Sequence, residues 1–291
     1  MKRIALATCT KLPTLNEDDL LLVPPLRELG VTAVPAVWDS PDECWEEFQG
    51  VVIRSCWDYH HRLEEFLAWV TRLERAGIPL WNPPAVLRWN SHKGYLRDLA
   101  ARGIPTVPTR WLRRGGGEPV DLAMLLEDAG WPDAVVKPAV SASASGTWRT
   151  STEAAARDQA RLGELLRAGD VMVQPFVSEV RDQGEWSILF LGGQLSHAVL
   201  KRPTEGDYRV QWEFGGSALT MAPPSRLVAD AEAVMAAVPG DPVYARVDGV
   251  ERDGRLVLME LELIEPHLFL GWDAGAAARL ATALGALVTR P

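Results

Sequence analysis

The decisive stretch of this sequence is Arg255-Leu-Val-Leu-Met-Glu260-Leu-Glu262-Leu-Ile-Glu265-Pro266, near its C-terminal end. Polar and apolar residues alternate there, which predicts a β-strand with two unlike faces. Side chains two positions apart share a face, so Glu260 and Glu262 point one way and Leu261 and Leu263 the other. The strand therefore predicts a sheet that is buried on one face and acidic on the other.

The run Tyr244-Ala-Arg246-Val-Asp248 predicts a second strand just before this one. The residues Arg252-Asp253-Gly254 lie between the two strands, and Asp-Gly is typical of a β-hairpin turn. The hairpin brings Asp248 to Glu260 and Glu262. Clustered carboxylates are costly to bury without a cation, and oxygen ligands suit Mg²⁺ or Mn²⁺. Spacing leaves two interpretations open: a metal site formed by these three residues, or an acidic face in contact with solvent.

Composition narrows the class of function. The chain has 291 residues, which is enough for two or three lobes with their own cores. Its net charge is -9 and it has no long basic block, which argues against a nucleic-acid or membrane-surface binder. Cys9, Cys44 and Cys56 have neither a disulfide nor a zinc pattern. The short apolar run after the first residues does not predict a signal peptide, and no apolar stretch is long enough to predict a membrane span. We expect a cytoplasmic protein that binds small molecules.

The first 85 residues predict a small α/β domain with a mostly parallel sheet. Strands are expected at residues 2–7, 31–38 and 51–54, and helices before Gly30 and over residues 64–76, the latter ended by Gly77. Loops at the carboxyl ends of such strands bind ligands, so Ser55, Asp58 and Tyr59 are candidate substrate contacts. The same loop also fits a polar turn with aromatic packing.

The central part of the chain predicts a site for an anion. Residues 81–84 break helices and form the expected domain boundary, and a helix over residues 90–102, capped by Asn90, carries Lys93 in its first turn. A buried strand over residues 134–138 then ends at Lys137. The small-residue loop that follows, at residues 141–149, is rich in donors for phosphate, although its composition also fits a flexible linker.

The last part of the chain adds further cations. We expect a strand at residues 170–177 and a hairpin of residues 186–191 and 194–200 that leads to Lys201. A polar segment at residues 204–216 carries Arg209, and helices are expected at residues 225–238 and 274–288. The five histidines have no triad or metal spacing and are expected in loops or packing. Cations, a small-residue loop and carboxylates together predict phosphoryl transfer.

The order of these motifs resembles the ATP-grasp ligases, and within them the glutathione-synthetase-like subgroup. The resemblance covers about residues 86–270. Its motifs are VVKP, MVQPFV, GEW, LKRP, YRVQ, ARVDG and LMELELIEP. The R-x-D strand followed by E-x-E is the most specific part, and Glu262 stands where the wider family usually has asparagine.

The resemblance implies an α/β ATP-grasp fold, in which two lobes sandwich ATP beside an N-terminal parallel domain. The expected domains are residues 1–85, 86–176 and 177–291. Two Mg²⁺ ions, with Mn²⁺ as the alternative, would bind Asp248, Glu260 and Glu262. The implied catalytic residues are Arg246, Arg209 and Lys201. The implied nucleotide contacts are Lys93, Lys137, Ser141, Ser143, Ser145, Gly146, Thr147, Gln174, Pro175, Phe176, Val177, Glu185, Lys201 and Arg209.

A narrower similarity concerns the cyclo-ligases that form D-cycloserine from O-ureido-D-serine. The phrases VIRSCWDYHHRLEEFLAW, WNSHKGYL, PAVSASASGTWR and ELELIEPHLFL carry it. It implies a ligase of antibiotic biosynthesis that activates a carboxylate as an acyl phosphate for a nitrogen in the same molecule. Asp58 would bind the ammonium group of this amino acid, and Arg246 and Ser55 its carboxylate. The alternatives are an intermolecular, glutathione-synthetase-like ligase and a nucleotide-binding protein without turnover. A homo-oligomer is a further expectation.

Overall fold

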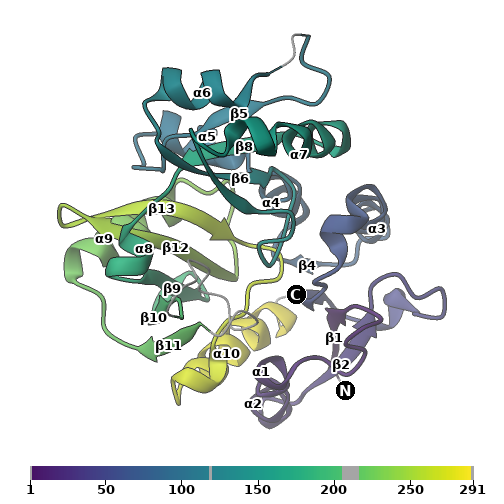
Figure 1. The fold of residues 1–291 in the computed structure, drawn as a ribbon. Helices are drawn as coiled ribbons and strands as arrows, with labels where there is room; N and C mark the ends of the chain where they lie inside the picture. Colours follow the sequence, from purple (N-terminus) through teal and green to yellow (C-terminus); the bar gives the residue numbers. More distant parts are fainter. Residues whose placement is uncertain (1, 118–119, 205–215, 290–291) are drawn as a thin grey trace.

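The computed structural model describes residues 2–117, 120–204 and 216–289, which form three β-sheets (Figure 1). The first sheet is parallel throughout and has the order β2-β1-β3-β4. Its strands are β1 (Lys2–Thr8), β2 (Val31–Val37), β3 (Val51–Ser55) and β4 (Leu80–Trp81). The predicted parallel α/β domain at the N-terminus is confirmed.

The helices of this first unit follow the sequence expectations with one difference. Helix α3 (Leu63–Arg75) buries Phe66 and Trp69 against the sheet, and Gly77 follows it with a φ of 70°. The single helix expected before Gly30 is two short helices, α1 (Glu17–Leu20) and α2 (Val23–Glu28). Prolines in the first turn of α2 favour a new helix start there.

A second sheet, of four antiparallel strands, forms the top of the molecule in Figure 1. Its order is β5-β8-β6-β7, with β5 (Arg110–Leu112), β6 (Asp133–Pro138), β7 (Trp148–Ser151) and β8 (Val171–Pro175). Helices α6 (Leu122–Ala129) and α7 (Ala155–Ala168) pack on one face of it. Strand β7 and helix α7 had not been predicted from the sequence.

The third sheet has five antiparallel strands in the order β11-β10-β9-β12-β13. They are β9 (Glu185–Leu191), β10 (Gln194–Arg202), β11 (Ser217–Thr220), β12 (Tyr244–Arg252) and β13 (Arg255–Glu262). Helix α9 (Ser225–Ala236) packs on its apolar face, and the short helix α8 (Glu179–Asp182) precedes β9. Both predicted hairpins are confirmed. Asp253 and Gly254 have positive φ angles at the β12–β13 turn, as this tight turn requires.

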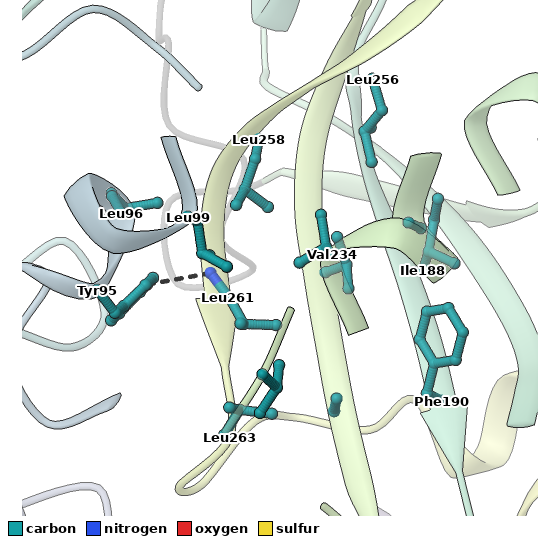
Figure 2. Close-up of a cluster of buried hydrophobic side chains, with 14 of the residues drawn as sticks. Tyr95, Leu96, Leu99, Ile188, Phe190, Val234, Leu256, Leu258, Leu261 and Leu263 are labelled. Atoms are coloured by element: carbon teal, nitrogen blue, oxygen red, sulfur yellow. Dashed lines mark hydrogen bonds between the residues drawn. The ribbon is translucent and has the colours of Figure 1, made fainter. Parts of the chain in front are cut away.

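Strand β13 has the two unlike faces that its alternation predicts. Leu261 and Leu263 lie in the core with Val234 of α9, and the main-chain N–H of Leu261 donates to the hydroxyl of Tyr95 at 3.0 Å (Figure 2). Glu260, which is next to Leu261 in sequence, lines the opposite side. Burial of the leucine face thus fixes the direction in which the acidic face points.

The prediction of one helix over residues 90–102 is wrong about where the helix begins. Two helices occupy this region, α4 (Pro84–Asn90) and α5 (Tyr95–Ala101), and Asn90 is the last residue of the first. The Asn90 side chain donates to the carbonyl of Leu261 at 2.8 Å and accepts from the N–H of Leu263 at 2.9 Å. These tertiary bonds to β13 take the place of a helix cap. Lys93 lies in the turn between the helices, where its N–H donates to the carbonyl of Ala139 at 2.8 Å.

The C-terminal helix α10 (Ala276–Thr289) returns to the first unit. It packs beside α2 and shares a buried cluster with Ile4 and Leu6 of β1. Helices α4 and α5 contribute to the core of the five-stranded sheet. The three predicted domain ranges remain a prediction. Helix α10 of the last range packs on the first unit, and residues of the middle range pack into the core of the five-stranded sheet, so these contacts do not separate the three ranges. Within the described ranges, no helix is both long and apolar enough to span a membrane.

Candidate active site

A cavity of about 590 Å³ brings together residues from the two antiparallel sheets and from segments that connect the strands of the parallel sheet. Lys137 and Gln174 line it from the small antiparallel sheet, and Trp57 and Tyr59 from the loop after β3. The five-stranded sheet contributes most of its charged lining: Glu185, Lys201, Arg246, Asp248, Glu260 and Glu262. A volume of this size is within the range of pockets that enclose small-molecule ligands.

The charged lining comes from one face of neighbouring strands. Strand register pairs Lys201 with Glu185 and Arg246 with Glu262, and it places Asp248 opposite Glu260. Residues that face each other in antiparallel strands extend from the same side of the sheet. The prediction that the β12–β13 hairpin unites Asp248, Glu260 and Glu262 is therefore confirmed as a juxtaposition.

Each carboxylate on this face contacts a cation. The Nε of Arg246 lies 2.9 Å from Asp248, and its Nη2 donates to Glu262. The Nζ of Lys201 lies 2.6 Å from Glu185 and 3.4 Å from Asp248. Glu260 pairs with the Nζ of Lys93 at 3.1 Å, which connects β13 to the turn between α4 and α5.

The pKa values on this face show opposing forces. Burial raises the pKa of Asp248, but Arg246 and Lys201 lower it more, so the net shift is downward and the group stays ionised. Burial raises the pKa of Glu262 to about 7, because repulsion by Glu260 and Asp248 adds to it and Arg246 offsets only part. A further cation beside these carboxylates would relieve that repulsion.

The predicted metal ligands fit a Mg²⁺ ion that is completed by other ligands. Within residues 2–117, 120–204 and 216–289, no group of three His, Cys, Asp or Glu side chains is arranged as a ready metal site. Mg²⁺ usually binds through one or two carboxylates together with substrate phosphates. Asp248, Glu260 and Glu262 supply such oxygens, and a bound Mg²⁺ would neutralise charge on a transferring phosphoryl group. Their assignment as ligands stays a prediction.

Lys137 is a cation without a carboxylate of its own. Its ammonium group lines the cavity and makes no ion pair or hydrogen bond to any residue that the structure describes. Burial lowers the pKa of Lys137, and Lys93 lowers it further against the opposing effect of Glu260. Such a group gains most from an anionic ligand, since an ion pair offsets its desolvation. This observation supports the expected contact with ATP phosphates.

The small-residue loop after β6 lies at the same wall. Its cavity-lining members are Ser141, Ala142, Ser143, Ala144 and Thr147, while Ser145 and Gly146 are not among the lining residues. The Nζ of Lys93 donates to the carbonyl of Ser141 at 2.6 Å and to its hydroxyl at 3.1 Å. Lys93 thus ties the loop to Glu260.

The residues expected to hold the adenine and ribose also line the cavity. They are Gln174, Pro175, Phe176, Val177 and Glu185. The Gln174 side chain donates to the hydroxyl of Thr109 at 2.9 Å, and the Glu185 carboxylate is held by Lys201. Arg209, expected to face the γ-phosphate, lies outside the described residues.

Two of the three substrate candidates from the first domain do not line the cavity. The Asp58 carboxylate instead accepts from the indole of Trp38 at 2.9 Å and from Arg62 at 3.4 Å. The Ser55 hydroxyl is fully buried and donates to Asp19 at 2.6 Å. Only Tyr59 is part of the cavity wall. Tertiary partners hold both the Asp58 and the Ser55 side chains away from the cavity, and their substrate roles stay predictions.

Sequence reasoning missed several cavity residues. They are Glu17, Trp57, Glu265, His267, Phe269 and Trp272. Trp57 lay within a loop that was singled out, and Glu265 lay within the most informative stretch of all. Strand alternation stops at Glu262, so periodicity carried no signal for the direction of Glu265.

Comparison with known proteins agrees with this geometry. A family model described as the N-terminal domain of D-cycloserine synthetase DcsG matches residues 4–82. The cycloserine biosynthesis protein DcsG of Streptomyces lavendulae is 34% identical over 283 residues, which cover 90% of this chain and 92% of the relative. The chain belongs to the DcsG family. It is accordingly an ATP-grasp ligase that forms C–N bonds, as the motifs implied.

Solved structures support the family and its fold. A crystal structure of D-cycloserine synthetase DcsG superimposes with a TM-score of 0.88 at 30% identity, covering 99% of this chain and 100% of the other. A D-alanine–D-alanine ligase from Bacillus anthracis complexed with ATP has a TM-score of 0.70 at 16% identity, with 99% and 97% covered, which shows the shared fold. A glutathione synthetase of Parasynechococcus marenigrum is 32% identical over 151 residues, or 50% of this chain and 44% of the relative. The predicted ATP-grasp fold is confirmed.

Proposed function

We propose that this DcsG-family ligase converts O-ureido-D-serine into D-cycloserine at the expense of ATP. The observation that carries the proposal is the polar sheet face, where Lys201, Arg246, Asp248, Glu260 and Glu262 meet in one cavity. Lys137 also lines this cavity and has no ion-pair partner among the described residues. A phosphate chain and a carboxylate substrate both need such an array, since both bring negative charge into the cavity. Membership of the DcsG family supports the choice of substrate.

The first step forms an acyl phosphate. A carboxylate oxygen of the substrate attacks the γ-phosphorus of ATP, and ADP leaves with the electrons of the broken P–O bond. Lys137 and Lys201 line the cavity and would neutralise phosphate oxygens during the transfer. Arg246 lies between Asp248 and Glu262, where its guanidinium would orient the substrate carboxylate.

The second step closes the ring. The ureido nitrogen bonded to oxygen attacks the acyl carbon and gives up its proton, and inorganic phosphate leaves with the electrons of the C–O bond. Loss of the carbamoyl group to water, as carbon dioxide and ammonia, then leaves D-cycloserine. The residues of the cavity would favour this path by holding both reacting ends of one molecule within reach.

The ligase would work with a divalent metal ion in the cytoplasm. Mg²⁺ would be the physiological ion, with Mn²⁺ as the alternative, because a hard divalent cation suits the carboxylate oxygens of Asp248, Glu260 and Glu262. The cytoplasm supplies ATP and keeps thiols reduced, which agrees with the free cysteines Cys9, Cys44 and Cys56.

Product analysis tests the proposal. The enzyme is incubated with Mg-ATP and O-ureido-D-serine, its L-enantiomer or a panel of other amino acids, and products are identified by mass spectrometry while phosphate release is measured. We expect D-cycloserine, ADP and phosphate from the D-enantiomer. A dipeptide product would identify an intermolecular ligase. If none of the amino acids in the panel led to ADP formation, the proposal would be without support.

A further inference from the structure

Glu265 differs from the other carboxylates that line the cavity. Glu265 is 8% exposed, and its carboxylate makes no ion pair or hydrogen bond with any other described residue. Glu185, Asp248, Glu260 and Glu262 all contact a lysine or arginine. Glu17 also lines the cavity but is exposed to solvent. Glu265 is therefore a buried carboxyl group that lines the cavity without a cation among the described residues.

The main chain around Glu265 is held from both sides. The indole of Trp57 donates to the carbonyl of Glu265 at 3.2 Å, and Arg54 donates to the carbonyl of Pro266 at 2.7 Å. Arg246 donates to the carbonyl of His267 at 3.2 Å. Three consecutive carbonyls thus have side-chain donors, two from the first domain and one from the polar sheet face. This clamp fixes the main chain from which the Glu265 side chain reaches the cavity.

The surroundings of Glu265 make an isolated charge costly. Burial raises its pKa well above the ordinary value, and the neighbouring charge of Glu262 raises it further. After burial itself, Glu265 is the largest influence that raises the pKa of Tyr59, and likewise that of Cys56, which places the carboxylate beside the aromatic wall of the cavity. A cation that enters this wall would offset the desolvation of the carboxylate.

We propose that Glu265 is the subsite for the α-ammonium group of the substrate, so that the enzyme selects carboxylic acids that carry this group. The inference deepens the proposed function and rests on it for the identity of the amino acid. Arg246 joins the two halves of the subsite, because its side chain contacts both Glu262 and the carbonyl of His267, two residues beyond Glu265. The substrate carboxylate would lie toward Arg246 and its ammonium toward Glu265. Glu265 thereby takes the role that the sequence had suggested for Asp58.

A competing role for the same residue is that of a general base for the ureido nitrogen. The two roles differ in what a des-amino substrate, with hydrogen in place of the ammonium group, would reveal. Such an analogue keeps the carboxylate and the ureido group, so a base would still be needed for it. A subsite for ammonium would have nothing to bind.

Calorimetry with Mg²⁺ and a non-hydrolysable ATP analogue present separates binding from turnover. O-ureido-D-serine and its des-amino analogue are titrated into the wild type, Glu265→Gln, Glu265→Asp and Glu64→Gln. Glu64 is exposed on α3 and does not line the cavity, so Glu64→Gln controls for the loss of one negative charge. Melting temperature and affinity for the ATP analogue verify that each variant is folded. Asp58→Asn is titrated in the same way, because Asp58 is the carboxylate that the sequence had suggested for the ammonium group.

We expect the wild type and Glu64→Gln to bind the amino acid at least about tenfold more tightly than the des-amino analogue, since a charge-assisted hydrogen bond is worth that factor or more. Glu265→Gln should bind both ligands equally, and Glu265→Asp should keep part of the preference. Retention of the full preference in Glu265→Gln, or its loss in Asp58→Asn alone, would overturn the inference. An equal loss for both ligands would assign Glu265 to a structural or base role and would also overturn it.

A failure of the proposed substrate can be distinguished from a failure of the ammonium subsite. If O-ureido-D-serine does not bind the wild type, the proposed substrate is wrong, and the titration is repeated with D-serine and D-alanine and their des-amino acids. Loss of a preference for the amino acid in Glu265→Gln would then still support the ammonium subsite. A wild type that prefers none of these amino acids over its des-amino partner would refute it.

Discussion

Two buried charge networks in this molecule use similar residues and differ in what their charges face. In the first domain, Arg54 pairs with Asp19 at 2.9 Å, and both side chains are only 1% exposed. Ser55 and Asn16 donate to the same carboxylate at 2.6 and 2.7 Å, and Arg54 also donates to the carbonyl of Pro266. Every charge of this closed network has a partner inside the protein.

The open network lies on the five-stranded sheet. Arg246, Asp248 and Glu262 are paired, yet Glu262 and Glu260 keep 27% and 33% of their side chains exposed toward the cavity. Here, ion pairs hold the groups in place and leave oxygens and donors available to a ligand. Ion pairing alone therefore does not separate a structural charge from a functional one. What separates the two kinds of charge is whether their remaining donors and acceptors point into the protein or into the cavity.

The largest effect is expected from breaking the closed network. Arg54→Met leaves Asp19 as an uncompensated buried charge, which should reduce the free energy of unfolding by about 3–5 kcal/mol. Urea unfolding followed by tryptophan fluorescence measures this change. A variant as stable as the wild type would show that the network is dispensable for the fold and would remove the contrast with the open network.

Breaking the open network should act on turnover and leave stability nearly unchanged. Glu260→Gln removes a charged ligand from the predicted metal site and should lower kcat by about 10²–10³, the usual effect of losing one electrostatic contact to a transition state. ADP release is measured over a range of Mg²⁺ concentrations, with the melting temperature as the control for folding. Near wild-type turnover at limiting Mg²⁺ would take Glu260 out of the site.

A smaller effect is expected from the cation that belongs to neither network. Lys137→Met removes an ammonium group whose pKa is lowered by burial, so the melting temperature should hold or rise. The KM for ATP should increase about tenfold or more, because one charge-assisted contact to phosphate is lost. Steady-state kinetics at varied ATP tests this. An unchanged KM and kcat would mean that Lys137 does not contact the nucleotide.

The smallest effect concerns acid stability of the first domain. Burial, with repulsion by His61, lowers the pKa of His60 to about 4, below its ordinary value of about 6.5. Above pH ~6.5 both folded and unfolded states hold neutral His60, and as the pH falls toward 4 only the unfolded state gains the proton. The free energy of unfolding should therefore fall as the pH falls over that range, because unfolding takes up as much as one proton at His60.

The variant His60→Leu isolates this contribution. Its free energy of unfolding should fall less steeply between pH 6.5 and 4 than that of the wild type, as measured by urea unfolding at several pH values. Parallel curves for the two proteins would show that His60 titrates normally in the folded state.

Much of the open network could be predicted from the sequence, because local periodicity determines it. The alternation of Glu260 and Glu262 with Leu261 and Leu263 assigns the strand faces without knowledge of any neighbour. The Asp253-Gly254 turn predicts the hairpin itself. The pairing of Asp248 with Glu260 also depends on a one-residue register shift between Asp248 and Gly249, which the sequence did not signal. The strand faces and the turn needed only a few consecutive residues, and the motifs built on them identified the ATP-grasp family.

Tertiary structure alone decided the directions of side chains outside regular strands. Asp58 turns to Trp38 and Arg62, and Asn90 bonds to β13 in place of capping a helix, because distant partners satisfy their hydrogen-bonding groups. Glu265 lies just beyond the end of β13, where period-two alternation no longer applies, and its clamp depends on Trp57 and other residues far away in sequence. Such contacts arise only when the chain closes on itself, since loop side chains take their direction from the groups they meet.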